Sequence, residues 1–308
     1  MSAMKKIKRV ANGVPAAGEF DSHTRDDADF ELGRESATFT SIQDLRGNAV
    51  AVDAMLVAAA GEHHMLLKVD RDAAAEAQAV VEALGRVTGK HVVTVPPDAK
   101  GSDFLGSSDN PGIFEQADGG ILYVPDAQEM SAAELDMLHT PVDLGAVHYS
   151  RGGEQFTVPA DFQLIIGVTA APADMDVAQA RRQQARISGP LRERMGLITP
   201  VVTTDTSKPI TVTEDEAIAL TEAARERIAA DLKDTPWTKL SQVPGAWLRG
   251  PLKRLNSTLS KPLDRALERG GVTMRGYDRV LRSAHTSAAM DGSEVTAAHL
   301  EKSMANRI

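Results

Sequence analysis

The chain has 308 residues, of which 42% are hydrophobic and 25% charged, so it can bury a large core in one large and one smaller domain. A net charge of −9 and an aromatic content of 4% disfavour strong global attraction to nucleic acid and a base-stacking surface. The absence of cysteine excludes disulfides and thiolate metal sites. No apolar stretch is long enough to span a membrane, and the first residues lack a signal peptide's apolar segment, so we expect a cytoplasmic protein.

The first two thirds of the chain predict an arm followed by an α/β domain. Residues 1–37 carry charge, glycine and proline without periodicity, which is typical of a mobile arm. In residues 38–205, helices are expected in "NAVAVDAMLVAAA", "AAAEAQAVVEAL" and "SAAELDMLHTPV". Strands are expected in "MLL", "HVVTV", "GILYV" and "FQLIIGV", and a hairpin in "AVHYS" and "QFTVP". This alternation predicts an α/β fold with a mostly parallel sheet.

In residues 206–308 the hydrophobic residues recur with the period of an α-helix, which predicts an all-helical C-terminal domain. The expected helices are "EDEAIALTEAARERIAADL", "LSKPLDRALERG", "MRGYDRVLRSAHTSAAM" and "TAAHLEKSMANRI". The stretch 239–282 holds ten Lys and Arg against three acidic residues. One interpretation is a surface for nucleic acid or an acidic partner. The other is the solvated face of amphipathic helices.

Three longer stretches occur in a fixed order, "GNAVAVDAMLVAAAGEHHMLL", "LDMLHTPVDLGAVHYSRGGEQFTVPADFQLI" and "RRQQARISGPLRERMGL". Together they resemble the magnesium-chelatase subunit I-like branch of the AAA+ ATPases, in particular the bacterial ComM/YifB type. The resemblance covers residues 38–308. It implies an AAA+ P-loop-type core, a helical lid and a ring of subunits with ATP bound between them. Hydrolysis in such a ring drives remodelling of a partner or movement on DNA.

The resemblance places the phosphate loop at Val69 to Glu76. All three loop glycines are missing there, the lysine position is Ala75, and the hydroxyl position is Glu76. Without the lysine the loop lacks its main cation on the phosphates, and without the glycines it lacks backbone freedom. Asp70, Asp72 and Glu76 place carboxylates near a helix N-terminus, where they repel phosphate, and we expect Asp72 to cap that helix.

The remaining positions implied by the resemblance divide into two groups. The acidic motif falls on Pro125 and Asp126, and a proline side chain cannot bind Mg²⁺; the polar sensor position is Thr169. By contrast, Arg194 stands where the arginine finger reaches a neighbour's nucleotide, and Arg275 where a lid arginine senses it. Arg151 and Arg186 also match the family pattern, and ordinary salt bridges are the alternative interpretation of all four arginines.

The adjacent pair His63 and His64 does not predict a metal site, because neighbouring residues in an extended segment point to opposite faces.

Three hypotheses for function follow. The first is a pseudo-ATPase, with no bound cofactor, that acts as a scaffold or as a non-hydrolysing member of a homo- or hetero-oligomeric ring and donates Arg194 to an active partner. The second is an active ATP-dependent remodeller or helicase-like motor that uses ATP and Mg²⁺ through an atypical loop. The third is a DNA-binding or regulatory module built on the AAA+ fold. None of the three requires a membrane.

Overall fold

The fold was obtained as a computed structural model, which describes residues 39–107, 110–151, 154–171, 175–176, 178–179, 185–251 and 253–306. The predicted mobile arm, residues 1–37, lies outside these residues. Residues 39–308 cluster as one compact unit. Within the described residues, no helix combines the length and apolarity that crossing a bilayer requires.

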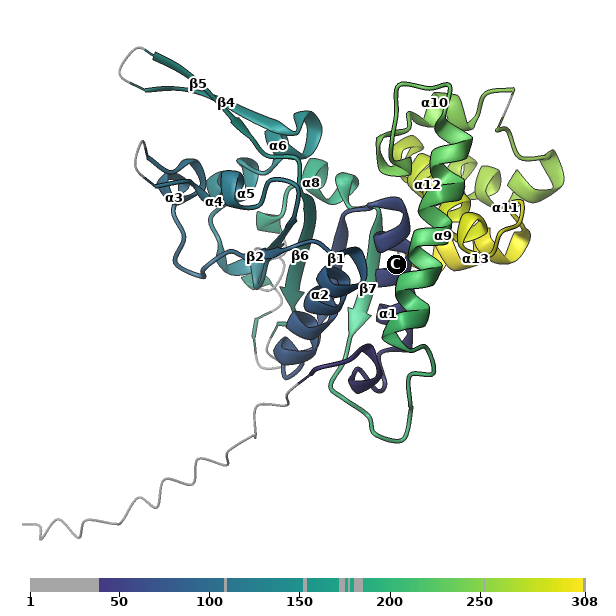
Figure 1. The fold of residues 1–308 in the computed structure, drawn as a ribbon, viewed down its shortest axis with the longest axis horizontal. Helices are drawn as coiled ribbons and strands as arrows, with labels where there is room; N and C mark the ends of the chain where they lie inside the picture. The colour runs from purple at the N-terminus through teal and green to yellow at the C-terminus, as the bar shows by residue number, and fades with distance from the viewer. Residues whose placement is uncertain are drawn as a thin grey trace, which may run out of the picture. The chain divides into compact units, whose positions relative to one another are not determined.

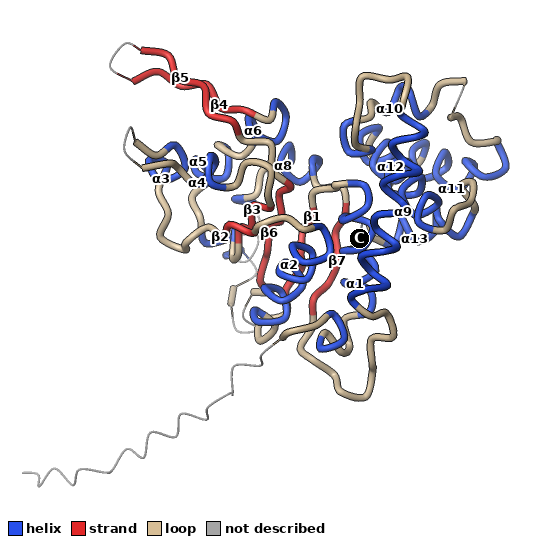
Figure 2. The backbone as a smooth tube through the Cα atoms, in the orientation of Figure 1, coloured by secondary structure: helices blue, strands red, loops and turns tan. Residues whose placement is uncertain are grey.

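A parallel sheet of five strands organises the first part of this unit (Figures 1 and 2). The strand order is β2-β3-β6-β1-β7, and Met65 on β1 pairs with Ile165 on β6 and Leu197 on β7. The strands are β1 (Met65–Val69), β2 (Val92–Thr94), β3 (Ile121–Val124), β6 (Gln163–Thr169) and β7 (Leu197–Val201). All four residues of β3 are buried, as expected for a parallel strand covered on both faces. The predicted parallel sheet is confirmed.

Two hydrophobic layers cover the two faces of the sheet. Met65 and Leu67 pack in one layer, with the helices α1 (Ala49–Gly61) and α2 (Ala74–Thr88). Leu66 points the other way, because side chains alternate along a strand, and it packs in the second layer. The second layer contains the short helices α3 (Gly101–Leu105), α4 (Ile113–Gln116), α5 (Ala132–Asp136) and α8 (Gly189–Arg194).

The segment "SAAELDMLHTPV" forms two helices instead of the single helix we predicted. Helix α5 ends at Asp136, and α6 (His139–Leu144) begins after two residues. Pro141 lies in the first turn of α6, where its missing N–H is tolerated. In a continuous helix the same proline would leave the carbonyl of Met137 without its bond and would clash with it. Proline therefore explains the break.

A two-stranded antiparallel hairpin follows α6 and projects away from the central sheet (Figure 1). Its strands are β4 (Ala146–Arg151) and β5 (Glu154–Pro159). The rings of Tyr149 and Phe156 stack across the two strands with centroids 5.4 Å apart. The predicted hairpin is confirmed, and its tip at 152–153 lies outside the described residues.

The second part of the unit is helical, as the sequence predicted. Its helices are α9 (Glu214–Leu232), α10 (Gly245–Leu248), α11 (Ser257–Glu268), α12 (Met274–Met290) and α13 (Ala297–Ala305). They enclose a hydrophobic cluster of their own, which includes Ile228, Leu263 and Leu281. Helices α9 and α12 also pack on α1, so the helical part is held against the sheet-containing part. The proposed domain boundary between residues 205 and 206 stays a prediction.

Candidate functional site

The turn between β1 and α2 is the segment to which the resemblance assigns phosphate binding. Four residues separate the end of the strand at Val69 from the start of the helix at Ala74. The amide of Ala73 donates to the carbonyl of Asp70 at 2.9 Å, which closes the turn. The amide of Asp70 donates to the carbonyl of Val201 at 2.9 Å. Both amides are therefore already bonded within the protein, whereas a phosphate loop points its amides at the ligand.

The prediction that Asp72 caps α2 is wrong. The N-cap residue is Ala73, and no side chain accepts a hydrogen bond from the first turn of the helix. A capping side chain must belong to the N-cap residue to reach the amides two and three positions later, and Asp72 lies one residue too early. Asp72 and Ala75 are both exposed.

Glu76 has a structural contact at the position where the resemblance expects a magnesium-binding hydroxyl. Its side chain is buried, with 7% of the residue exposed. One carboxylate oxygen accepts hydrogen bonds from the Thr204 amide at 2.9 Å and from the Thr204 hydroxyl at 3.0 Å. Thr204 lies in the connection that leads from β7 towards the helical part. Glu76 therefore fastens this connection to the first turn of α2.

The predicted acidic and sensor positions meet at the same edge of the sheet. Asp126 follows β3 in a left-handed conformation, with φ of 45°, and Thr169 is the last residue of β6. The Thr169 hydroxyl donates to the Asp126 carboxylate. Gln128 joins the two, because its side chain donates to Asp126 at 3.1 Å and accepts from the Thr169 amide at 3.2 Å. These side chains therefore bond to one another across two neighbouring strands.

Several groups at the phosphate-loop position are already bonded within the chain. At the phosphate-loop position two amides of the turn are bonded to carbonyls, and Glu76 is engaged with Thr204. Arg71 and Asp72 of the turn are both exposed and carry opposite charges. A cavity of about 490 Å³ lies beside the carboxyl edge of the sheet, lined in part by Lys68, Thr169 and Arg192. Val69 and Asp70, the first residues of the segment assigned to the phosphate loop, also line this cavity, so the cavity adjoins the phosphate-loop position.

Arg194 lies at the opposite, amino edge of the sheet. It is the last residue of α8, a short helix capped by the Ser188 hydroxyl and anchored by buried Leu191. The guanidinium Nε donates to Asp143 Oδ1 at 2.7 Å, Nη2 donates to Oδ2, and Nη1 donates to the Pro190 carbonyl at 2.8 Å. The hydrogen bond from Arg194 lowers the pKa of Asp143, and the same bond raises the pKa of Arg194. Both groups are therefore charged at neutral pH.

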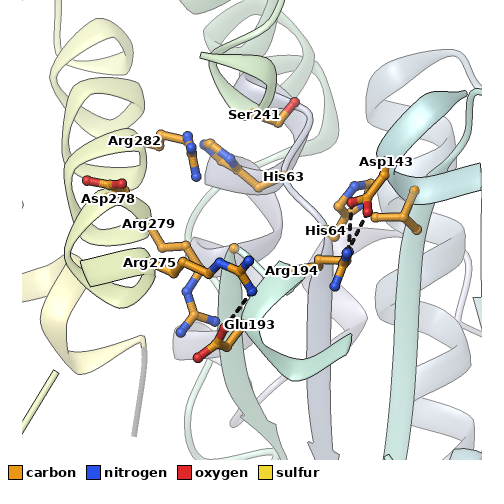
Figure 3. A pocket seen from close by; sticks show the side chains of 12 residues that line it. His63, His64, Asp143, Glu193, Arg194, Ser241, Arg275, Asp278, Arg279 and Arg282 are labelled. Carbon is orange, nitrogen blue, oxygen red and sulfur yellow. Dashed lines mark hydrogen bonds and ion pairs between the residues drawn. The ribbon is translucent and has the colours of Figure 1, made fainter. Parts of the chain in front are cut away.

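Arg275 lies on the first turn of α12 and faces the same cavity as Arg194 (Figure 3). The cavity has a volume of about 220 Å³. Arg275 is 68% exposed and donates to Glu193 at 2.9 Å. Arg279 and Arg282 of the same helix also line the cavity, and they donate to backbone carbonyls, as in the bond from Arg282 to Val243 at 2.7 Å. The structure thus brings the two predicted arginines together.

His63 and His64 precede β1 and lie at this amino edge. His63 Nε2 is 2.7 Å from the hydroxyl of Thr286 on α12, and burial lowers its pKa to about 3. His64 Nδ1 accepts the Leu164 amide proton at 3.0 Å, and burial lowers its pKa to about 4. Both rings are therefore neutral at pH 7. The two histidines therefore connect the start of β1 to its neighbour β6 and to the helical part.

Sequence reasoning missed the acidic partners of the arginines. Asp143 is 51 positions from Arg194, so no local pattern pairs them. Glu193 precedes Arg194 directly but bonds to Arg275, 82 positions away. Of the two further arginines, Arg186 donates to the carbonyl of Gln128 at 2.8 Å, and the side chain of Arg151 lies outside the described residues.

Comparison with known proteins gives a consistent picture. The family model "Magnesium chelatase, subunit ChlI" matches residues 101–208, and the model "Magnesium chelatase, subunit ChlI C-terminal" matches residues 213–307. An uncharacterised protein of Mycobacterium tuberculosis is 27% identical over an alignment covering 82% of this chain and 58% of that protein. YifB of Escherichia coli is 28% identical, and the competence protein ComM of Haemophilus influenzae is 23% identical, each over 66% of this chain and 42% of the relative. The chain therefore spans 58% or less of the length of these relatives.

Proposed function

Because the chain belongs to the magnesium-chelatase-like AAA+ family of the ComM/YifB type, we propose that it is a subunit that no longer hydrolyses ATP. In this proposal it is a scaffold or a non-hydrolysing member of a ring. It presents Arg194 to a nucleotide held by another subunit.

The main support is the state of the β1–α2 turn. Two of its amides, those of Ala73 and Asp70, are bonded to the carbonyls of Asp70 and Val201, and Glu76 is bonded to Thr204. A triphosphate bound at the turn would bring several negative charges close to Asp72. Within the segment 69–76 the family's lysine is missing, and the single cation Arg71 stands against three carboxylates.

The positions of the two arginines support action on a second molecule. Arg194 and Arg275 lie at the amino edge of the sheet, whereas the β1–α2 turn lies at the carboxyl edge. A strand of five residues separates the two edges by about 16 Å. An arginine side chain at one edge cannot reach a phosphate at the other. The cavity at the amino edge is open to solvent at Arg275, so a phosphate presented by a partner could reach it.

Calorimetric titration of the full chain with ATP and Mg²⁺ tests the proposal. We expect no binding at the β1–α2 turn up to millimolar nucleotide. Micromolar binding that persists in Arg275→Ala, and therefore does not depend on the amino-edge cavity, would refute the proposal. Turnover of ATP that disappears on Asp126→Ala would favour the alternative of an active ATPase with an atypical loop, because the resemblance assigns Asp126 to the acidic motif and Thr169, which donates to it, to the sensor position.

A second candidate function, contact with nucleic acid, is favoured by the cations around α11. Six of the ten cations in 239–282 bond to other groups of the chain, and Lys253 is among them, paired with Asp231 at 2.6 Å. The other four are exposed, and among the described residues none makes an ion pair with them; they are Arg254, Lys261, Arg265 and Arg269. Lys261, Arg265 and Arg269 recur every fourth residue. This spacing places the first two on one side of α11 and the third just beyond its end.

This second function predicts a salt-dependent affinity for duplex DNA. Each phosphate contact contributes about 0.9 to the slope of log K against log salt, so neutralising Lys261, Arg265 and Arg269 should reduce the slope by about 2.7. A matched control neutralises three exposed lysines elsewhere, Lys100, Lys208 and Lys233. Equal slopes for the two triple variants would exclude α11 as the contact surface.

A further inference from the structure

Arg194 is already bonded to a group that resembles its expected ligand. Its Nε and Nη2 donate together to the two oxygens of Asp143, with Nε 2.7 Å from Oδ1. A guanidinium uses the same pair of parallel donors to bind a carboxylate or a phosphate. Asp143 therefore occupies the side of Arg194 at which a phosphate would bind.

The backbone around Asp143 holds it in this position. Asp143 is the fifth residue of α6, a helix of six residues that has Pro141 in its first turn. The helix ends at Gly145, whose φ of 65° suits a glycine, and β4 begins at the next residue. The carboxylate is thus placed by the end of a helix and the base of the β4–β5 hairpin.

The pair of Asp143 and Arg194 is also able to open. The side chain of Asp143 is 46% exposed and that of Arg194 is 24% exposed. If they separate, water can solvate both charges, and the large penalty of an unpaired buried charge does not apply.

Other hydrogen-bond donors surround this pair. Because His64 is neutral and its Nδ1 accepts the amide proton of Leu164, the ring proton lies on Nε2. His64 lies beside Arg194 and Asp143, and Arg275 approaches from α12 on the other side of the cavity (Figure 3). A phosphate that replaced Asp143 would therefore meet donors from two helices and from the residue before β1.

We infer that Asp143 competes with phosphate for Arg194. Its carboxylate binds Arg194 where an incoming terminal phosphate would bind, and it leaves when that phosphate docks. The source of the phosphate, a nucleotide bound to another subunit, rests on the proposed function. The competition itself is a property of this chain. It lets the chain keep Arg194 ordered and neutralised until a partner arrives.

The inference can be tested with inorganic pyrophosphate and the full chain, by following the arginine Nε–Hε signals in NMR spectra. Asp143→Asn should increase the affinity for pyrophosphate on the order of fivefold, which corresponds to the contribution of one partly exposed ion pair. Asp143→Glu restores a carboxylate and should return the affinity towards that of the wild type. Asp234→Asn, which removes one exposed carboxylate from the turn after α9, is the control for net charge.

A double variant separates competition at Arg194 from a general electrostatic effect. Adding Arg194→Gln to Asp143→Asn should abolish the gain in affinity, because the released guanidinium is no longer present. Equal affinities for Asp143→Asn and Asp234→Asn would overturn the inference, and so would a gain that persists in the double variant. No step uses ATP, so ATP binding at the β1–α2 turn would refute the proposed function and leave this inference standing.

Discussion

Replacing Glu76 with alanine tests whether this carboxylate has become a structural group. The substitution removes both hydrogen bonds that the carboxylate accepts from Thr204, at 2.9 and 3.0 Å. Hydrogen bonds of this kind contribute about 1 kcal/mol each to stability, and more when the acceptor is charged. Thr204 is itself exposed, so water can replace the lost acceptor in part. We therefore expect the free energy of unfolding to fall by about 2 kcal/mol.

Urea unfolding of wild type and variant measures this loss directly. Glu82→Ala is the matched control, because Glu82 lies on the same helix, is exposed and accepts one bond from Gln78 at 3.0 Å. We expect it to change the free energy of unfolding by about 0.5 kcal/mol or less. If Glu76→Ala were no more destabilising than Glu82→Ala, the assignment of a structural role to Glu76 would fail. Glu76→Thr, which restores the family's hydroxyl, should lose the same stability and still show no ATP binding.

Two further predictions concern the contact between the α1–β1 connection and α12. The folded-state pKa of His63 is about 3 and its ordinary value is 6.5, so the unfolded chain binds one proton more between these pH values. Its contribution is complete above pH 6.5 and is lost as the pH falls, with a slope of up to about 1.4 kcal/mol per pH unit. Burial also lowers the pKa of His64 and His285, which add to the slope in the same pH range. In urea unfolding from pH 7 to 4, the slope of His63→Gln should therefore be smaller than that of the wild type by up to this amount, and equal slopes would contradict the assignment. Gly61→Ala would place a Cβ 2.3 Å from His63 Nε2 and 2.6 Å from Thr286 Oγ1, so it should lower the free energy of unfolding by about 1–3 kcal/mol. Gly189→Ala is the control, because its Cβ would meet nothing within 4 Å. Equal melting temperatures for the two variants would refute this prediction.

The elements that the sequence predicted well are those with local signals. The expected segment "MRGYDRVLRSAHTSAAM" coincides with α12, which the hydroxyl of Thr273 caps through the Gly276 amide. Strand β7 was not predicted, because "LITPV" is short and contains Pro200. The structure explains how it is tolerated: β7 is an edge strand, and one side of an edge strand needs no ladder bonds.

For the site, the sequence could predict which residues share an edge but not which groups bond. Asp126 comes after β3 and Thr169 ends β6, so the sequence places both at the carboxyl edge of a parallel sheet, whereas the pairing of β3 with β6 is seen only in the structure. The bonds from Arg194 to Asp143 and from Thr204 to Glu76 join residues 51 and 128 positions apart. Such pairs depend on how helices pack on the sheet, which periodicity does not encode. The failed prediction for Asp72 came from a helix start misplaced by one residue.

The bond between Glu76 and Thr204 has a mechanical consequence. Asn48 strengthens the same connection, because its side-chain amide exchanges two hydrogen bonds of 2.9 Å with the backbone of Val202. A ligand can move a lid only if it binds the two lid positions unequally. Here the group that fixes the connection, the Glu76 carboxylate, belongs to the chain itself, so unlike a ligand it does not bind or dissociate. In the proposed ring, the angle between the sheet-containing part and the helical part of this subunit would stay fixed. The corresponding angle in its neighbours would change.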